Sequence, residues 1–444
     1  MFPFLRSLFF TTRFYLLMAA GVCLLVLAHL LPPLLPAVQI GCVALGIGVL
    51  IELLTLYTGG QTVVATRTMS DRFSIGDFNP VTITLESRYR FAVRTTILDE
   101  LPVQFQVRES QVVQTLRPGE QITLRYELRP VTRGVYAFGR LLIYVTGQLG
   151  LVQRRLVQEA SREVPVYPSY IQMRKYQLLA ISDRLSDVGV KKVRRIGHTS
   201  EFDQIKSYVG GDDVRTINWK ATARSGSLMV NQYTDERAQH VYCLLDKSRA
   251  MKMPFEGMSL LDYAINTALV VSNIALYRQD RAGLVTFAEK IHDSLPATAN
   301  ASQMSQILEL LYHQETTFPE ADFGRLYAFV KRKIPQRSLL LLFTDFTTVA
   351  ALERQLPFLQ KIAQAHLLLV IFFENTELTA RTQAHPEFVE DIYVQAIAEQ
   401  FVLDKKQIVR TLEQHHIMAV LTPPEELTVK VLNKYIEIKS RGMA

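Results

Sequence analysis

Two long apolar runs near the N-terminus constrain the fold of this chain more than any other feature. Residues 14–31 are apolar or small except for one tyrosine and one histidine, and residues 34–57 form a second run with Glu52 near its end. A helix needs about 20 apolar residues to cross a bilayer. The two prolines between the runs cannot continue a helix. The pattern predicts a transmembrane helical hairpin within residues 1–60, with helices at about 14–31 and 34–57.

Arginines flank both runs, and the loop between the runs carries no charge. Arg6 and Arg13 precede the first run, and Arg67 and Arg72 follow the second. The positive-inside rule places both chain ends in the cytoplasm and predicts a multi-pass protein of the inner (cytoplasmic) membrane. A signal peptide is the competing interpretation, but no small-residue cleavage site follows the first run. Glu52 is either a functional acid in the membrane or, as we prefer, a carboxylate that reaches the interface.

Composition bounds the number of domains and the chemistry. The 444 residues are 48% hydrophobic, which is enough for two or three cores and a membrane segment. The net charge of +7 suits an anionic lipid leaflet, an acidic protein or nucleic acid, without choosing among them. Cys23, Cys42 and Cys243 show no CxxC spacing and lie in apolar runs, so neither a disulfide framework nor a zinc site is indicated.

The middle of the chain, residues 61–168, shows short alternating or β-branched runs separated by turn signals. This pattern predicts an antiparallel β-sandwich. No group of catalytic side chains occurs in it, so we expect a spacer or docking module. Strands are expected at residues 81–85, 103–107, 122–128 and 141–145.

The rhythm changes in residues 241–444, where continuous apolar runs alternate with stretches of helical periodicity. Continuous apolar runs are typical of strands buried on both faces. Strands that alternate with helices predict a parallel, doubly wound, Rossmann-like α/β sheet, in which ligands bind outside the carboxyl ends of the strands. The expected strands are residues 241–245, 283–287, 339–343, 367–373 and 417–421.

Oxygen-bearing side chains follow two of these strands. Asp246 ends one strand and Asp345 follows another, and hydroxyl groups occur at Ser248, Thr316 and Thr317. Carboxylates and hydroxyls are the ligands that a hard cation such as Mg²⁺ accepts.

The sequence Asp246-Lys247-Ser248-Arg249-Ala250 resembles the metal-ion-dependent adhesion site of von Willebrand factor A domains. The resemblance implies that Asp246, Ser248, one of Thr316 and Thr317, and Asp345 would bind Mg²⁺. Ala250 departs from the pattern because it replaces a serine hydroxyl, and Lys247 and Arg249 add positive charge, so the site is degenerate. The alternative is that the two aspartates cap helices and hold loop amides.

A second concentration of signal lies between residues 201 and 237. It contains Tyr208-Val209-Gly210-Gly211-Asp212-Asp213-Val214-Arg215 and Asn218-Trp219-Lys220-Ala221-Thr222-Ala223-Arg224. These residues closely resemble the signature of a bacterial family called domain of unknown function fifty-eight, and we assign residues 169–240 as its signature segment. The resemblance implies a membrane-anchored protein with a von Willebrand factor A-like domain. It also implies association with MoxR-type AAA+ ATPases and other membrane von Willebrand factor A-like proteins, in assembly or maturation of protein complexes.

Two interpretations of the signature remain open. One is a recognition surface, because arginine and tryptophan are enriched at interface hot spots. The other is an internal ion-pair and stacking network that fastens the segment to the α/β domain. An acid-base or two-metal role for the aspartate pair is a less simple account, because arginine lies so near in sequence. The interaction residues are Asp212, Asp213, Arg215, Trp219, Lys220 and Arg224.

Missing motifs also guide the functional prediction. The sequence contains no GxxxxGK[ST] loop, GxGxxG turn, HExxH pair or GxSxG elbow, so the usual support for nucleotide hydrolysis, zinc proteolysis and α/β-hydrolase chemistry is absent. We expect a non-enzymatic, cytoplasm-facing scaffold. The alternative is a metal-dependent hydrolase that uses Asp246 and Asp345. A weaker alternative is nucleic-acid binding through Lys191-Lys192-Val193-Arg194-Arg195, but contact with the lipid bilayer explains that run more simply, so no nucleic acid is expected.

Overall fold

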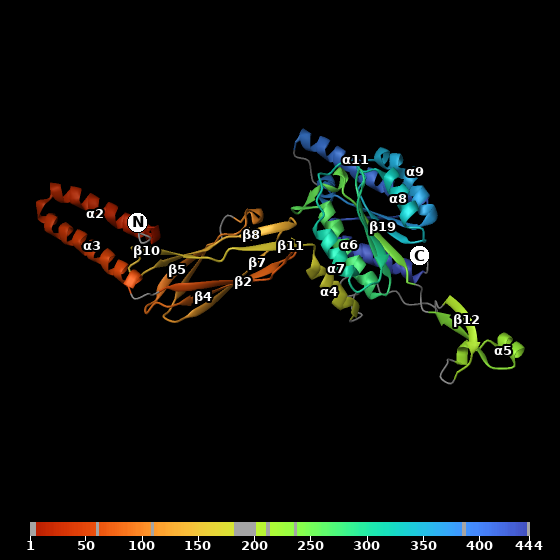
Figure 1. Ribbon diagram of the computed structural model, residues 1–444. Coiled ribbons are helices and arrows are strands. Elements are labelled where there is room, and N and C mark those ends of the chain that lie inside the picture. Colours follow the sequence, from red (N-terminus) through yellow and green to blue (C-terminus); the bar gives the residue numbers. More distant parts are fainter. Residues whose placement is uncertain are drawn as a thin grey trace. The chain divides into compact units, whose positions relative to one another are not determined.

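The computed structural model describes residues 6–58, 62–107, 111–181, 201–209, 214–234, 238–383 and 388–441. The chain divides into two compact units, Met1–Tyr167 and Pro168–Ala444. Figure 1 shows the helices and strands of both units.

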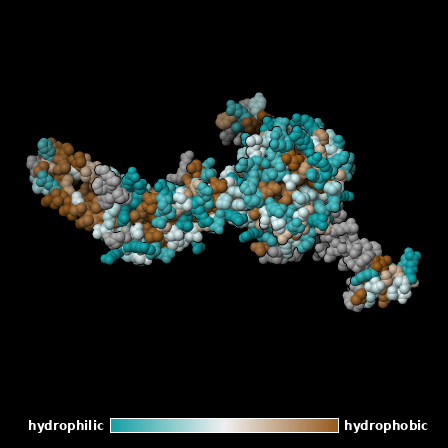
Figure 2. All heavy atoms as spheres, in the orientation of Figure 1, coloured by the Kyte–Doolittle hydropathy of each residue, from teal (hydrophilic) through white to brown (hydrophobic). Residues whose placement is uncertain are grey.

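The first unit begins with the expected pair of apolar helices, α2 (Thr12–Leu30) and α3 (Leu35–Tyr57), joined through the short helix η1 (Pro32–Leu34). Both helices are long and apolar enough to span a membrane, and their apolar side chains face outward, as Figure 2 shows. A third helix of suitable length, Leu260–Tyr277, is 83% buried and therefore belongs to a protein core.

The rest of the first unit is the expected β-sandwich. Its sheets have the orders β1-β10-β9-β5-β6, β2-β4-β7 and β3-β11-β8, and all pairings are antiparallel except the short one between β3 and β11. Buried and exposed residues alternate along β4, which directs Val81, Ile83 and Leu85 into the core. The strands are β1 (Leu8–Phe10), β2 (Val63–Met69), β3 (Phe73–Ser74), β4 (Asn79–Ser87), β5 (Val93–Asp99), β6 (Gln111–Leu116), β7 (Gln121–Leu128), β8 (Gly134–Phe138), β9 (Leu141–Thr146), β10 (Val152–Gln158) and β11 (Arg162–Tyr167).

Both ends of the helix pair are built into the sandwich. β1 precedes α2 and pairs with β10, so that Phe9 lies opposite Gln153. At the other end, the buried carboxylate of Glu52 accepts hydrogen bonds from the backbone amides of Gly150 (2.9 Å), Leu151 (2.7 Å) and Val152 (2.9 Å). Glu52 is therefore a structural acceptor inside the protein, and our preferred placement of its carboxylate at the lipid interface was wrong.

A further expectation for this unit was wrong. Residues 103–107 do not form a strand but a 3-10 helix, η3 (Val103–Phe105), after which Gln106 adopts a left-handed conformation with φ 53°. Pro102 has no amide proton to pair with a neighbouring strand. Arg67, one of the arginines counted in the orientation prediction, forms a buried ion pair with Asp99.

The second unit contains a six-stranded sheet of order β18-β17-β14-β19-β20-β21. All neighbours are parallel except the edge strand β18, and this arrangement confirms the predicted doubly wound α/β class. All five expected strands are present. The edge strand β18 was not predicted. The strands are β14 (His240–Asp246), β17 (Arg281–Phe287), β18 (Ile291–Thr298), β19 (Leu339–Phe343), β20 (Leu367–Phe373) and β21 (Met418–Thr422).

Helices cover both faces of this sheet. Val241, Cys243 and Leu245 of β14 pack into a cluster with α6 and α12, whereas Tyr242 and Leu244 pack into a second cluster with α8 and α9. Side chains of consecutive strand residues point to opposite faces, so a strand with two apolar faces requires both layers. The helices are α4 (Tyr170–Ile181), α6 (Leu260–Tyr277), α7 (Gln303–Tyr312), α8 (Phe323–Lys333), α9 (Val349–Ala365), α10 (Thr376–Gln383), α11 (Val389–Gln414) and α12 (Leu427–Ser440).

The segment 169–240, which we assigned as the signature segment, has two parts in the structure. Met173 and Tyr176 of α4 pack against the core cluster that contains α6. The remainder includes a hairpin of β12 (Glu201–Ser207) and β13 (Met229–Thr234), with η5 (Val214–Thr216) and α5 (Trp219–Ser225) between the strands. We call β12, η5, α5 and β13 the signature hairpin. Asn218 caps α5 by accepting a hydrogen bond from the amide of Ala221 (3.0 Å).

Candidate functional site

The two aspartates expected to act together lie at one edge of the α/β sheet. Asp246 is the last residue of β14, and Asp345 comes two residues after the end of β19. The two strands are parallel neighbours, with Leu245 opposite Phe343. The carboxyl ends of neighbouring parallel strands meet at the same edge, so the strand topology brings the two side chains there.

The carboxylate of Asp246 is buried and hydrogen-bonded. One oxygen, Oδ1, accepts from the amide of Ser248 (2.8 Å), and the other, Oδ2, accepts from the hydroxyl of Thr344 (2.6 Å). Burial raises the pKa of Asp246 to about 6, the negative charge of Asp345 acts in the same direction, and the hydrogen bonds from Thr344 and Ser248 oppose the increase. Asp246 thus holds a loop amide, as in the alternative interpretation of this residue.

Asp345 is paired with a lysine that the sequence did not indicate. Lys405 of α11 forms an ion pair with Asp345 Oδ1, and both side chains are largely buried. The ammonium group also lies 5.8 Å from the centre of the Phe372 ring. Lys405 is 60 residues away from Asp345 along the chain, and no motif or spacing connects the two.

The hydroxyl groups differ in their surroundings. Thr316 Oγ1 donates to the carbonyl of Lys247 (2.8 Å) and accepts from the amide of Phe318 (2.9 Å), so Thr316 lies against the Asp246 loop. Thr317 is exposed. Ser248 is buried, and its backbone amide donates to Asp246.

These contacts test whether the site suits a divalent cation. Ala250 supplies no oxygen, the ammonium of Lys405 already neutralises Asp345, and the Thr316 hydroxyl already bonds the carbonyl of Lys247 and the amide of Phe318. Within the described ranges, no three His, Cys, Asp or Glu side chains are grouped so as to hold a metal ion. As arranged, the residues do not fit Mg²⁺. The pairing of Asp345 with Lys405 also disfavours the hydrolase alternative, which needs that carboxylate for chemistry.

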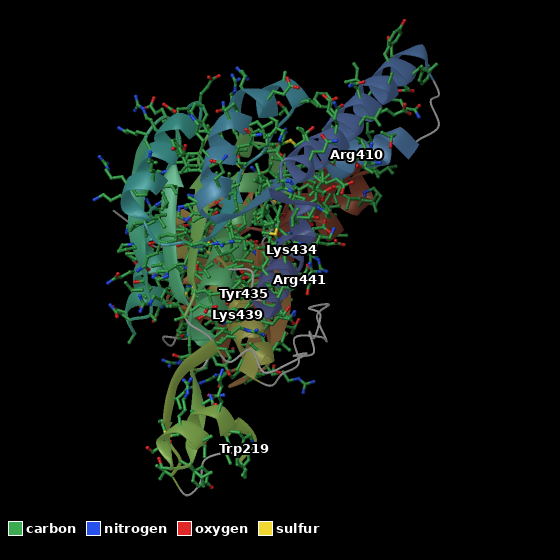
Figure 3. All side chains as sticks on the ribbon, turned by 90° about the vertical axis from the view of Figure 1, so that its right-hand side faces the viewer. Trp219, Arg410, Lys434, Tyr435, Lys439 and Arg441 are labelled. Carbon is green, nitrogen blue, oxygen red and sulfur yellow. The ribbon has the colours of Figure 1, made fainter. Side chains whose placement is uncertain are left out.

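The signature residues lie in and around the signature hairpin. Trp219 is the first residue of α5 and is 70% exposed (Figure 3). Lys220 and Arg224 of the same helix are also exposed. Arg215 belongs to η5. Asp212, Asp213 and the basic run 191–195 lie outside the described residues. The exposure of Trp219, Lys220 and Arg224 favours a recognition surface over an internal network.

A doubly wound sheet with one antiparallel edge strand, and a modified adhesion-type loop at its carboxyl edge, defines a von Willebrand factor A-like α/β protein. Residues 204–378 match the family described as "Protein of unknown function DUF58". This match confirms the resemblance that the signature indicated, and it extends from the signature hairpin through Asp246 and Asp345 to α10.

Known relatives add little about activity. The chain is similar to an uncharacterized protein, YeaD, of Bacillus subtilis (strain 168), with 27% identity over 180 residues. The match covers 39% of this chain and 44% of YeaD, so it spans less than half of that relative's length.

Three solved structures illustrate the fold similarities. The VWA domain of SpRpn10 is 12% identical, with a TM-score of 0.28, and the match covers 44% of this chain and 93% of that domain. The conserved hypothetical protein BatB from Bacteroides thetaiotaomicron is 14% identical, with a TM-score of 0.30. The match covers 46% of this chain and 100% of the BatB chain. A PapD-like domain of human CEP192 is 13% identical, with a TM-score of 0.20. The match covers 24% of this chain and 86% of that domain. Scores this low carry no argument about function.

Proposed function

We propose that this chain is a membrane-anchored, cytoplasm-facing interaction protein without enzymatic activity of its own. In this proposal it works with a MoxR-type AAA+ ATPase, and with other membrane von Willebrand factor A-like proteins, in the assembly or maturation of protein complexes. The observation that carries the proposal is the exposure of Trp219 beside Lys220 and Arg224. Leaving a large aromatic side chain in water forgoes roughly 2 kcal/mol of burial, and such residues beside cations are typical of binding hot spots.

The geometry of the first unit supports anchoring by a hairpin. β1 before α2 and β2 after α3 both belong to the sandwich, so both helix ends lie on the side of the membrane where the sandwich lies. The turn between the helices then lies on the opposite side. This arrangement agrees with the predicted multi-pass topology.

Arginines from the sandwich support the cytoplasmic orientation. Arg154 of β10 donates to the carbonyl of Leu56 (2.6 Å) and lies 4.6 Å from the centre of the Tyr57 ring. Arg155 donates to the carbonyl of Arg6 (3.0 Å). Cations beside the ends of membrane helices favour the cytoplasmic side. These two arginines replace Arg67 in the orientation argument, because Arg67 is neutralised by Asp99.

Affinity capture of the nanodisc-embedded protein from its own cells tests the proposal. We expect wild-type protein to recover a MoxR-type ATPase and expect Trp219→Ala and Arg224→Glu to lose it. Arg354→Glu, which reverses an exposed arginine on α9, is the matched control and retains capture. Capture that survives both signature changes in folded protein would contradict the proposed surface.

Magnesium is a second variable in the same experiment. Because Lys405 already neutralises Asp345, we expect capture to be the same with Mg²⁺ and with a chelator. Capture that requires Mg²⁺ in the wild type, and loses that requirement in Asp246→Ala, would instead assign a metal to the site.

A further inference from the structure

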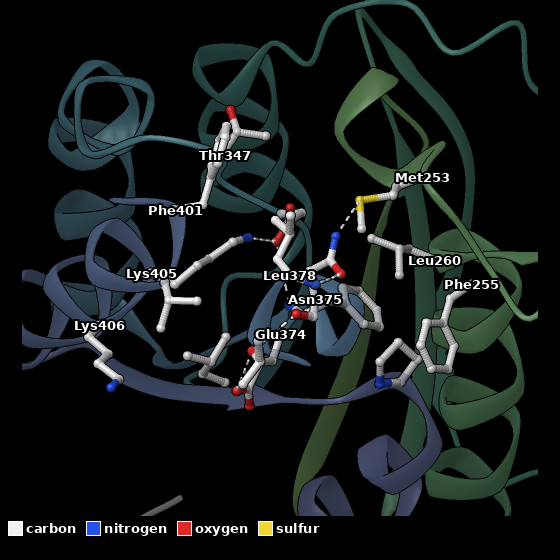
Figure 4. A pocket seen from close by; sticks show the side chains of 16 residues that line it. Met253, Phe255, Leu260, Thr347, Glu374, Asn375, Leu378, Phe401, Lys405 and Lys406 are labelled. Carbon is white, nitrogen blue, oxygen red and sulfur yellow. Dashed lines mark hydrogen bonds and ion pairs between the residues drawn. The ribbon is translucent and has the colours of Figure 1, made fainter. Parts of the chain in front are cut away.

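A mostly apolar pocket of about 270 Å³ opens at the carboxyl edge of the α/β sheet, beside the Asp345–Lys405 ion pair (Figure 4). Its walls include Phe373 at the end of β20, Leu378 of α10 and Phe401 of α11. Sites for small molecules usually measure about 300–1,000 Å³. This pocket is smaller, and its size suits a single large side chain.

An exposed apolar row on α11 leads to this pocket. Tyr393, Ile397 and Phe401 are spaced four residues apart, so they share one face of the helix. They are 69%, 58% and 38% exposed. Phe401 also lines the pocket, so row and pocket form one continuous surface, which we call the α11 surface. Contiguous exposed apolar residues with polar surroundings mark interaction sites.

The charge around the α11 surface indicates the chemistry of its partner. Residues 374–406 contain seven carboxylates against one arginine and two lysines, and one of those lysines, Lys405, is already paired with Asp345, in a chain whose net charge is +7. Among them, Glu374 lines the pocket, and Glu390 and Glu377 are exposed. An anionic cytoplasmic leaflet repels such a segment, whereas a basic protein segment is attracted to it.

We propose that the α11 surface binds an amphipathic helix of a partner protein. That helix carries large apolar side chains at four-residue spacing, one of which enters the pocket, and basic residues that face the carboxylates. Apolar anchors at helical spacing that pack into a groove are a common mode of peptide recognition. The α11 surface shares no residue with the signature hairpin, so this inference goes beyond the proposed function.

A model peptide tests this inference on the full-length protein in nanodiscs of zwitterionic lipid. The probe is a fluorescent amphipathic peptide of about 18 leucines and lysines, five helical turns long. Its counterpart carries glutamate in place of lysine. Fluorescence anisotropy measures binding, and empty nanodiscs provide the lipid background. We expect the lysine peptide to bind at least about tenfold more tightly than the glutamate peptide.

Variants of α11 locate the binding. Ile397→Ser removes an apolar anchor and Glu390→Lys reverses a neighbouring charge, and each is expected to weaken binding of the lysine peptide by about tenfold or more. Two matched controls are Leu403→Ser and Glu399→Lys, which change exposed residues on other sides of α11. Both controls, and Trp219→Ala, are expected to bind as the wild type does. Circular dichroism confirms that each variant is folded.

Three outcomes would overturn the inference. The first is equal binding of the two peptides, and the second is equal loss in the controls and in Ile397→Ser. The third is a lower sedimentation mass of Ile397→Ser, which would identify a second copy of the chain as the occupant. Because Trp219 is unaffected by these changes, failure here leaves the proposed capture of an ATPase standing.

Discussion

Lys405 illustrates how one side chain decides the chemistry of a site. Its ammonium group neutralises Asp345 where the adhesion-type pattern would use a divalent cation. We propose that this tethered cation holds the loops at this edge together without an ion from solution. Removing one partner of a buried ion pair costs about 3–5 kcal/mol, because the other charge remains buried without compensation.

Replacing Lys405 tests whether its ammonium group takes the place of a bound Mg²⁺ ion. We expect Lys405→Met to lower the free energy of unfolding by about 3 kcal/mol, and expect Mg²⁺ to raise the melting temperature of Ala250→Ser/Lys405→Met but not that of the wild type. Lys406→Met, at an exposed neighbouring position, is the control. Thermal unfolding with Mg²⁺ or chelator measures both effects. An equal increase with Mg²⁺ in wild type would contradict the tethered cation.

The raised pKa of Asp246 makes the stability of the folded protein depend on pH. Its pKa is raised from 3.8 to about 6 in the folded state, so the native protein binds more protons than the unfolded chain between those values. Stability contributed by the protonated acid is present below pH 3.8 and is lost as pH rises through about 6. The loss is on the order of 3 kcal/mol. We expect Asp246→Asn to lack this component in denaturant unfolding measured from about pH 3 to about pH 7, roughly one pH unit beyond each pKa. If the free energy of unfolding of Asp246→Asn depends on pH as that of the wild type does, Asp246 is not the group responsible.

Among the helices and strands, those buried on both faces were predicted from the sequence more accurately than exposed ones. The boundaries of β19 and β20 were predicted to the residue, because strands covered on both faces are continuous apolar runs. The edge strand β18 escaped prediction. Exposed, mostly polar residues alternate with less exposed ones along β18. Pro296 has no backbone N–H to donate to a neighbouring strand. Residues 103–107 were apolar enough to resemble a strand but have no strand partner in the described structure.

The candidate site was predictable only in part for a related reason. The carboxyl-edge rule placed Asp246 and Asp345 at one edge of the sheet from sequence alone, whereas the structure shows that their strands are neighbours. Lys405 and Thr344 could not be assigned to them, because contacts from a distant helix or a neighbouring loop follow from packing and leave no spacing signal. Glu52 was singled out for its charge in an apolar run, but its acceptor role depends on amides about 100 residues away.

The join between α3 and the sandwich provides a test at this scale. Glu52→Ala leaves the three amides of residues 150–152 without their acceptor, and each buried amide left unpaired costs about 1–3 kcal/mol. We expect faster hydrogen exchange at these amides and a loss of stability of at least about 2 kcal/mol. Glu127→Ala, an exposed change in the same unit, should leave exchange unaltered. Unchanged protection in Glu52→Ala would show that other contacts hold the join.

At the scale of the whole molecule, the sandwich fixes both ends of the apolar helix pair through β1, β2 and Glu52. A domain that holds both ends restricts the pair to entering and leaving the membrane on one side. The proposed orientation places that side in the cytoplasm, where an AAA+ ATPase and its ATP are available.

Cysteine labelling tests this orientation. Cys23 and Cys42 are replaced by alanine, Cys243 is buried, and Glu127→Cys places a thiol on the exposed face of β7. We expect a membrane-impermeant maleimide to label this thiol in inverted vesicles and not in right-side-out vesicles. The reverse pattern would place the sandwich, and the segments that depend on it, outside the cytoplasm.

We propose that the exposed face of the signature hairpin binds a MoxR-type ATPase. The most direct measurement is a titration of the nanodisc-embedded protein with the purified ATPase from the same cells, comparing wild type with Trp219→Ala. We predict saturable binding of the wild type and a weakening of about tenfold or more in the variant, as for a hot-spot aromatic residue. Equal dissociation constants, or no binding by the wild type, would contradict binding through the signature hairpin.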